Sequence, residues 1–232
     1  MILTHSEAYE QVQNLLKVYP KLKTIESDSE KIRLYGLIEV YRSACNYILQ
    51  KEYLIEIIIP INSNEFPTVI DKGNMIAQEY AHRYPNGELC LETNTAIKLR
   101  FIDSFDLVAW MDEFVEPYFF SYEYYSRYGE FPFGERPHGL EGIIHTYQQL
   151  FHTDDLQQAC SLLVYAAENN YRGHIQCPCK SGKKLRNCHG QYLFPFMTDL
   201  RKKDIALSDL NYLRKELIAL EQSRSDYSKT KR

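Results

Sequence analysis

Three cysteines and a histidine are the residues in this chain of 232 whose types and spacing point most directly to chemistry. One residue separates Cys177 from Cys179, and the pair Cys188-His189 follows after eight more. Thiolates and imidazoles are the ligands that a tetrahedral Zn²⁺ site uses. The spacing therefore predicts one structural zinc site formed by Cys177, Cys179, Cys188 and His189. The alternative is a set of free thiols beside a surface histidine.

The segment around these ligands favours the zinc interpretation. Its sequence, GHIQCPCKSGKKLRNCHG, has few apolar side chains and needs a metal to hold a fold. The stretch CPCKSGKKLRNCHG resembles the SEC-C motif, a small zinc-binding appendage of many unrelated bacterial proteins. The resemblance implies a docking element that contacts proteins or nucleic acid and that is not itself catalytic.

Cys90 is the second candidate for chemistry. It lies between Leu89 and Leu91, directly after the turn-forming sequence Tyr84-Pro85-Asn86-Gly87. A lone cysteine between leucines is usually a small core residue, but the turn predicts a surface-facing edge. A nucleophilic cysteine needs a lowered pKa or a nearby base, and His82 is the nearest base in the sequence. Packed core and nucleophile are both open at this point.

The elements that must position these residues change in type along the chain. Strand-like segments dominate residues 31–71 and helical segments follow Cys90, which predicts an α+β fold with an antiparallel sheet. The helix over 103–129 is expected to be capped by Asp103 or Ser104 and to kink or break at Pro117. The predicted strands are 31–41, 52–61 and 68–71, and the predicted helices are 5–18, 103–129, 140–151, 154–169 and 199–221.

The order of these pieces resembles the ubiquitin-conjugating (UBC) enzymes. The resemblance rests on Gly36 in LYGLIEV, on YLIEIIIP, on Phe66-Pro67 and on HRYPNGELCL, and it spans roughly residues 5–150. It implies a UBC-like antiparallel meander sheet with flanking helices. It also implies that Cys90 carries a modifier as a thioester.

The chain departs from the family just before Cys90. The family carries a His-Pro-Asn triplet whose asparagine is thought to stabilise an oxyanion, and here Tyr80, Ala81 and His82 occupy those positions. His82 can donate the same hydrogen bond and can also accept the proton of the amine. The loop GEFPFGERPHGLEG is like divergent bacterial relatives in antiphage operons, including the cyclic-oligonucleotide (CBASS) type. His138 in this loop either approaches the site or caps a helix.

Charge and composition suggest how the chain is organised. Residues 172–232 have a net charge of +8 against −12 for residues 1–171, so the basic part faces an acidic partner or forms a solvated surface. The expected divisions are a conjugating-like domain over 1–152, a helical connector over 153–172, the zinc motif over 173–192, and an amphipathic helix with a basic tail over 193–232.

Other features of the sequence are predicted to be structural. No signal peptide is visible and the longest apolar run, 53–61, is too short for a bilayer and contains Glu56, so a cytoplasmic protein without a membrane segment is expected. Cys45 and Cys160 are predicted to be packed, and His145 and His152 are predicted to be structural or solvated.

The leading hypothesis is a transferase of the ubiquitin-conjugating type. Cys90 accepts an activated C-terminal glycine as a thioester and passes it to a target amine with help from His82, while Zn²⁺ is structural. The modifier is a ubiquitin-like protein or the C-terminus of a partner nucleotidyltransferase, in bacterial antiviral defence. Activation requires that nucleotidyltransferase or an activating enzyme as partner, because the chain has no phosphate-binding glycine loop.

The alternative is a non-catalytic UBC-like and SEC-C binding adaptor, in which Cys90 is vestigial. A nucleic-acid adaptor ranks last, because the basic region lacks interleaved aromatic residues and any recognisable reading motif.

Overall fold

The contacts within the chain divide it into two units. The computed structural model describes residues 3–135, 137 and 139–230, and for residues 223–230 it describes the backbone alone. The first unit is Met1–Asn94 with Asp103–Arg136, and the second is Thr95–Ile102 with Pro137–Arg232. The contacts therefore assign residues 137–152 to the second unit, whereas the resemblance extends the conjugating-like region to residue 152.

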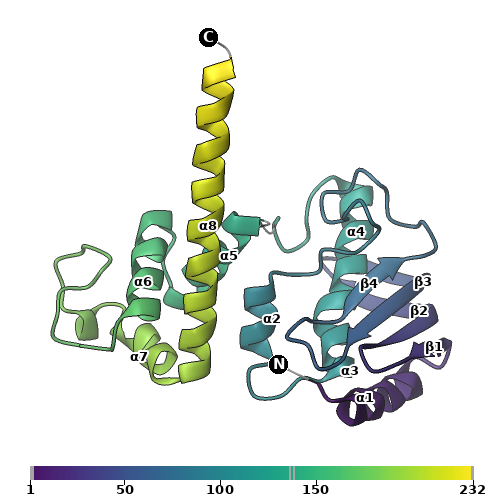
Figure 1. Ribbon diagram of the computed structural model, residues 1–232. Coiled ribbons are helices and arrows are strands. Elements are labelled where there is room, and N and C mark those ends of the chain that lie inside the picture. Colours follow the sequence, from purple (N-terminus) through teal and green to yellow (C-terminus); the bar gives the residue numbers. More distant parts are fainter. Residues whose placement is uncertain (1–2, 136, 138, 231–232) are drawn as a thin grey trace. The chain divides into compact units, whose positions relative to one another are not determined.

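The first unit is built on a four-stranded antiparallel sheet in the order β1-β2-β3-β4 (Figure 1). This confirms the predicted antiparallel meander. The sequence did not reveal β1, because Leu22 is its only buried residue and the others are mostly polar. The strands are β1 (Leu22–Ser27), β2 (Lys31–Ala44), β3 (Tyr47–Pro60) and β4 (Thr68–Asp71).

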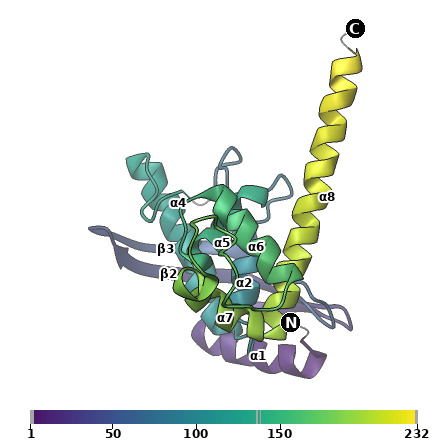
Figure 2. The same ribbon diagram turned by 90° about the vertical axis from the view of Figure 1, so that its left-hand side faces the viewer.

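Alternation along β2 and β3 decides which face of the sheet is buried. Ile32 pairs with Ile59 and Leu34 pairs with Ile57, and all four side chains are buried on one face. Helix α4 lies against this sheet (Figures 1 and 2), where Phe119 stacks on Tyr53 with ring centroids 4.0 Å apart. The helices of the first unit are α1 (His5–Val18), α3 (Leu107–Trp110), the π-helix η1 (Met111–Val115) and α4 (Glu116–Tyr128).

The long helix predicted over 103–129 begins later than expected. Asp106 caps it by accepting a hydrogen bond from the backbone N–H of Ala109, so the expected caps Asp103 and Ser104 are wrong. The helix does not end at Pro117. The π-helix η1 ends just before α4 begins, and Pro117 lies in the first turn of α4. Proline is tolerated there because it has no N–H to place in the regular α-helical bonding pattern.

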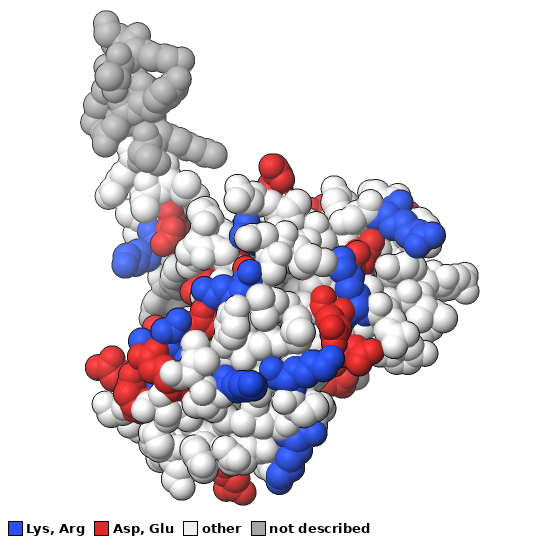
Figure 3. Space-filling model, turned by 90° about the vertical axis from the view of Figure 1, so that its right-hand side faces the viewer, with Lys and Arg blue, Asp and Glu red and all other residues white. Residues whose placement is uncertain are grey.

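The opposite face of the sheet carries paired charges. Glu56 is buried there between Arg33 and Lys72, with its Oε2 atom 2.7 Å from Lys72 Nζ, and Arg33 also contacts Glu26 at 2.8 Å. Figure 3 shows basic and acidic side chains lying next to one another on one face of the molecule. Arg33 and Lys72 are therefore already paired with carboxylates within the fold.

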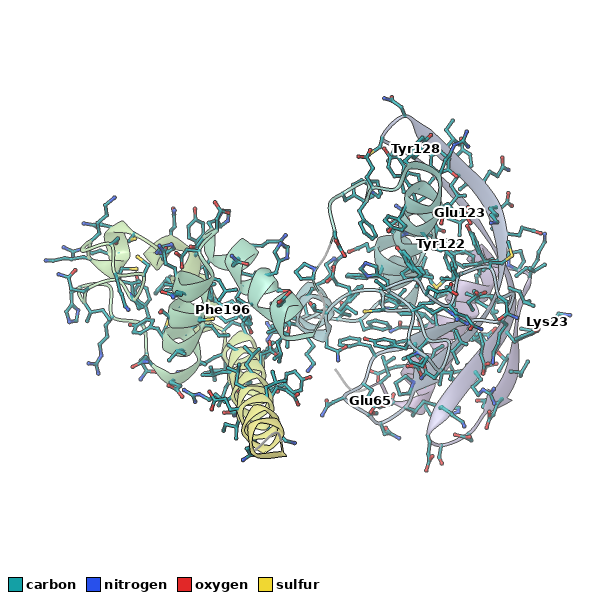
Figure 4. The ribbon with its side chains drawn as sticks, turned by 90° about the horizontal axis from the view of Figure 1, so that it is seen from above. Lys23, Glu65, Tyr122, Glu123, Tyr128 and Phe196 are labelled. Atoms are coloured by element: carbon teal, nitrogen blue, oxygen red, sulfur yellow. The ribbon has the colours of Figure 1, made fainter. Side chains whose placement is uncertain are left out.

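The second unit is helical and has its own core. The predicted helices over 140–151, 154–169 and 199–221 are confirmed, although the last continues to Thr230, and α7 was not predicted. Phe196 (Figure 4) packs edge-on against Phe151 with ring centroids 5.5 Å apart. The helices are α2 (Asn94–Arg100), α5 (Gly139–Phe151), α6 (Leu156–Glu168), the 3₁₀ helix η2 (Leu185–Asn187), α7 (Gly190–Thr198) and α8 (Leu200–Thr230).

None of the helices in the described part of the chain combines the length and the hydropathy that crossing a bilayer requires.

Candidate functional site

The structure brings the predicted metal ligands together in the second unit. One ligand atom from each of Cys177, Cys179, Cys188 and His189 lies within 4.8 Å of all the others. The Nδ1 atom of His189 is 3.3 Å from the sulfurs of both Cys177 and Cys188, and the sulfurs of Cys179 and Cys188 are 3.5 Å apart. A tetrahedral site with zinc–sulfur bonds of about 2.3 Å requires sulfurs about 3.8 Å apart. The group could therefore hold a metal ion.

A tight turn explains how ligands distant in sequence meet. Lys180 and Gly182 have positive φ angles of 61° and 75°, which reverse the chain between the two halves of the cluster. The backbone N–H of Cys177 then donates to the carbonyl of Lys183 at 2.9 Å. His189 is held at the start of α7, where a Cβ on Gly190 would lie 2.6 Å from the carbonyl oxygen of Leu185.

The environment of the cluster suits a bound cation. Cys177 and Cys179 are buried with Leu185 in the core of the second unit. Burial raises the pKa of Cys177 to about 12 and lowers the pKa of His189. A neutral imidazole is the form that binds a metal, and a divalent cation compensates the charge of thiolates that burial disfavours.

Cys90 lies in a hairpin of the first unit that extends the sheet beyond β4. The N–H of Gly87 donates to the carbonyl of Tyr84 at 2.9 Å, which closes the predicted turn, and Gly87 has a φ of +87°. The segment after the turn lies beside β4, because Glu88 forms an isolated bridge with Ile70 and the N–H of Leu89 donates to the carbonyl of Val69 at 2.9 Å. Cys90 is therefore the first residue beyond this added ladder.

The Cys90 thiol is half-buried, and two influences act on it. Its burial raises the pKa of the thiol, while a hydrogen bond from the hydroxyl of Tyr84, 3.4 Å from the sulfur, opposes that rise. Tyr84 is itself 50% exposed. Cys90 is therefore partly exposed, and the pKa of its thiol lies above the ordinary value.

His82 lies across the hairpin from Cys90. The backbone N–H of Cys90 donates to the carbonyl of His82 at 2.8 Å, and the hydroxyl of Tyr118 donates to the same carbonyl at 3.0 Å. The imidazole is buried between aromatic rings, with its centroid 5.3 Å from that of Tyr80 and 5.4 Å from that of Phe131. The fold thus brings the backbones of His82 and Cys90 together and fixes the imidazole by packing.

The other side chains singled out from the sequence belong to neither candidate site or lie outside the described residues. Cys45 was expected to be packed, but it is exposed in the two-residue turn between β2 and β3, where its φ is 49°. His145 and His152 line a shallow polar cavity of about 400 Å³ with Gln148 and Asp154. His138 lies outside the described residues.

Tyr84 and Tyr118 lie near Cys90 or its backbone partner, and the sequence assigned neither of them a role. Their contact with the cysteine or with its backbone partner depends on the hairpin and on the packing of α4, neither of which a linear motif displays. The turn sequence itself was the available signal for Tyr84, because position 84 begins it.

Comparison of the chain with family models, with curated proteins and with solved structures gave no match.

Proposed function

We propose that this chain is a ubiquitin-conjugating-like transferase in which Cys90 carries an acyl group as a thioester. The observation that supports this most directly is the placement of Cys90, half-buried at the end of a turn, with the Tyr84 hydroxyl on its sulfur. A residue placed only to fill the core would not keep a sulfur that a solvent-exposed phenol can reach. An opening helix followed by a four-stranded antiparallel meander is also what the resemblance implies, and the proposal rests on that resemblance as well.

The reaction has two steps that need no cofactor. In the first, the Cys90 sulfur attacks the thioester carbonyl of an activated C-terminal glycine, and the donor thiol leaves with the proton that Cys90 loses. In the second, an amine attacks the new thioester, an amide forms, and Cys90 regains its proton. Because a thioester carries its own driving force, the protein needs to orient the amine, bind the oxyanion and move one proton.

His82 serves the second step in this proposal. Its imidazole donates a hydrogen bond to the developing oxyanion or accepts the proton of the attacking amine. The first step requires deprotonation of a thiol whose pKa is raised, and binding of the donor's C-terminal segment next to Cys90 supplies that change of environment. Only the thiolate is the nucleophile.

We assign Zn²⁺ to the cluster of Cys177, Cys179, Cys188 and His189. Three sulfur ligands and one imidazole nitrogen suit tetrahedral zinc, and all four positions are filled by protein side chains, as in structural sites. When bound, zinc holds the fold of this segment and supplies no step of the transfer.

The partners follow from the chemistry. The donor is an activating enzyme that carries a C-terminal glycine as a thioester, either the glycine of a ubiquitin-like protein or that of a partner nucleotidyltransferase. The acceptor is a target protein with an exposed amine. From the resemblance we propose that this activity serves bacterial antiviral defence, in operons that include the CBASS type.

A synthetic peptide α-thioester ending in Gly-Gly tests the proposal without any partner. Mass spectrometry should find the acyl group on Cys90 of the intact protein, and dithiothreitol should remove it. Cys90→Ser should give a reductant-stable ester or no adduct. The exposed Cys45 is the internal control, because thioester exchange driven by access alone favours it. Acylation of Cys45 without acylation of Cys90 contradicts the proposal.

The binding adaptor is the second candidate, and the raised pKa of Cys90 is the observation in its favour. An adaptor has no need of a reactive thiol, so Cys90→Ala would leave its activity intact and would lower stability as a core truncation does, by roughly 2 kcal/mol. A transferase instead loses transfer and keeps its stability. Urea unfolding of Cys90→Ala separates the two.

A further inference from the structure

Arg83 is a second side chain of the Cys90 hairpin, and the proposed chemistry has not used it. Its backbone lies opposite Leu89 in the hairpin, one residue after His82 and on the strand that pairs with the one leading to Cys90. The guanidinium folds back over the turn, with its Nη2 atom 3.7 Å from the position that a Cβ would take at Gly87. The glycine leaves that side of the turn open to it.

The guanidinium of Arg83 has no acceptor among the residues that the structure describes. Its Nε atom is enclosed and makes no hydrogen bond, whereas the remaining guanidinium nitrogens are not enclosed. The arginines of β2 show the contrast: Arg33 pairs with Glu26 and Glu56, and Arg42 pairs with Asp112 and Glu116. The Nε atom of Arg83 is thus shielded from solvent, while its two Nη atoms can bind an anion from another molecule.

Arg83 and Cys90 share one neighbourhood. The carbonyl of His82 accepts hydrogen bonds from both the Cys90 N–H and the Tyr118 hydroxyl. Burial is the main cause of the raised pKa of Tyr118; the nearby Cys90 adds to the rise and the positive charge of Arg83 opposes it. Both side chains therefore act electrostatically on the same hydroxyl.

We propose that Arg83 binds a carboxylate of the polypeptide whose C-terminal carbonyl reacts with Cys90. This inference rests on the proposed function, and it defines the donor as a chain with an acidic residue close to its terminal glycine. A planar guanidinium binds a carboxylate through two parallel N–H···O bonds. The acyl donor is a polypeptide, so carboxylate side chains are the anions that it can offer.

Paired peptide thioesters test the donor. Each ends in Gly-Gly and carries either glutamate or glutamine at one of the preceding positions, and the rate of acylation of Cys90 is measured. At one of these positions, Cys90 of the wild-type protein should be acylated about tenfold faster by the glutamate peptide than by the glutamine peptide. Arg83→Gln should lose the preference, and Arg83→Lys should keep part of it as a point charge. Lys23→Gln is the matched control for loss of one positive charge, because Lys23 is exposed on β1 (Figure 4).

A binding measurement separates this inference from the proposed function. The Nε–H of Arg83 is enclosed, so its resonance should be observable by ¹⁵N NMR and is assigned by its loss in Arg83→Lys. Titrating Cys90→Ala with the glutamate peptide as an unreactive amide should shift that resonance, and the glutamine peptide should not. If neither peptide shifts it, or if Arg83→Gln retains the glutamate preference, the inference is wrong. If the resonance shifts but no peptide acylates Cys90, the anion site stands and the proposed transferase fails.

Discussion

At the scale of single residues, burial and hydrogen bonding have opposite effects on the pKa values of buried or half-buried groups. Burial raises the pKa of Cys90, and the Tyr84 hydroxyl partly offsets it. Asp209 shows the same competition in the second unit, where the hydroxyls of Thr95 and Tyr147 donate to its Oδ2 atom at 2.7 and 2.8 Å. In both places the fold keeps a polar atom in an apolar setting by giving it specific partners.

Replacing His82 should separate loading from discharge. His82→Ala should acylate Cys90 at the wild-type rate but should transfer the acyl group to lysine slower by on the order of 10²-fold, because its proposed role belongs to the second step. His82→Asn should recover most of that rate if the imidazole acts as a hydrogen-bond donor. Single-turnover discharge assays measure both variants. Because the ring is packed against Tyr80 and Phe131, thermal unfolding must first show that each variant is folded.

Asp209 should make the stability of the second unit depend on pH. Burial is the main cause of its raised pKa, which therefore lies above the unfolded value. The stability that this carboxyl contributes is thus fully present below its unfolded pKa and is lost as the pH rises through its folded pKa. The difference in unfolding free energy between Asp209→Asn and wild type should grow over that rise, as measured by urea unfolding.

Asp209→Ala is the contrasting variant. It leaves the Thr95 and Tyr147 hydroxyls without their acceptor and should cost about 1–3 kcal/mol for each. Equal pH profiles for Asp209→Asn and wild type would show that the carboxyl is not the titrating group.

At the scale of elements, the joint between η1 and α4 depends on one arginine. In the π-helical turn the N–H of Glu116 bonds to the carbonyl of Met111, so it does not bond to the carbonyl of Asp112 as it would in an α-helix. Arg42 of β2 donates to that carbonyl and also pairs with the carboxylates of Asp112 and Glu116. The π turn is therefore fastened to the sheet by a side chain distant in sequence.

Arg42→Ala should destabilise the first unit by about 2–4 kcal/mol, because it leaves a carbonyl and two carboxylates without their cation. Arg42→Lys should recover only part of this, since an ammonium cannot reach several acceptors in the fixed geometry of a guanidinium. Lys21→Ala is the control: it breaks an exposed pair with Glu52 and should destabilise the unit far less, because exposed ion pairs contribute little to stability. Equal losses for Arg42→Ala and Lys21→Ala in urea unfolding would contradict the assigned role.

At the scale of the whole molecule, each unit has a separate apolar core. Leu34 and Ile57 are in the core of the sheet, and Leu162 and Leu193 are in the core of the helical unit. Cys177 and Cys179 belong to the helical core, so a metal bound by these cysteines would stabilise that core and be stabilised by it.

Removing the metal should therefore unfold part of one unit and spare the other. With a chelator, backbone amides over 173–192 should lose protection from hydrogen exchange, and the neighbouring amides of α7 should follow, while β2 and β3 stay protected. Zinc should restore the protection. Loss of protection in the sheet at the same chelator concentration would show that the two cores unfold together. Well under one zinc per chain in unchelated protein would contradict the metal assignment.

Much of the local structure could be predicted from the sequence because the signals are short. Helix α1, strand β4 and the turn before Cys90 are recognised from periodicity and from turn residues a few positions apart. The ligand spacing of the Cys/His cluster is equally local, and the structure confirms that these four residues meet.

Contacts between segments distant in the sequence decided the rest. Strand β1 has six residues of which one is buried, and it forms because it pairs with β2. The hydroxyl of Tyr118 reaches the carbonyl of His82 through packing of distant segments, which sequence spacing does not reveal. The raised pKa of Cys90 and the enclosed Nε of Arg83 depend on which chain segments exclude water from them. Spacing along the chain selects the residues that could react, but burial and charge, which set their reactivity, arise only when distant segments pack together.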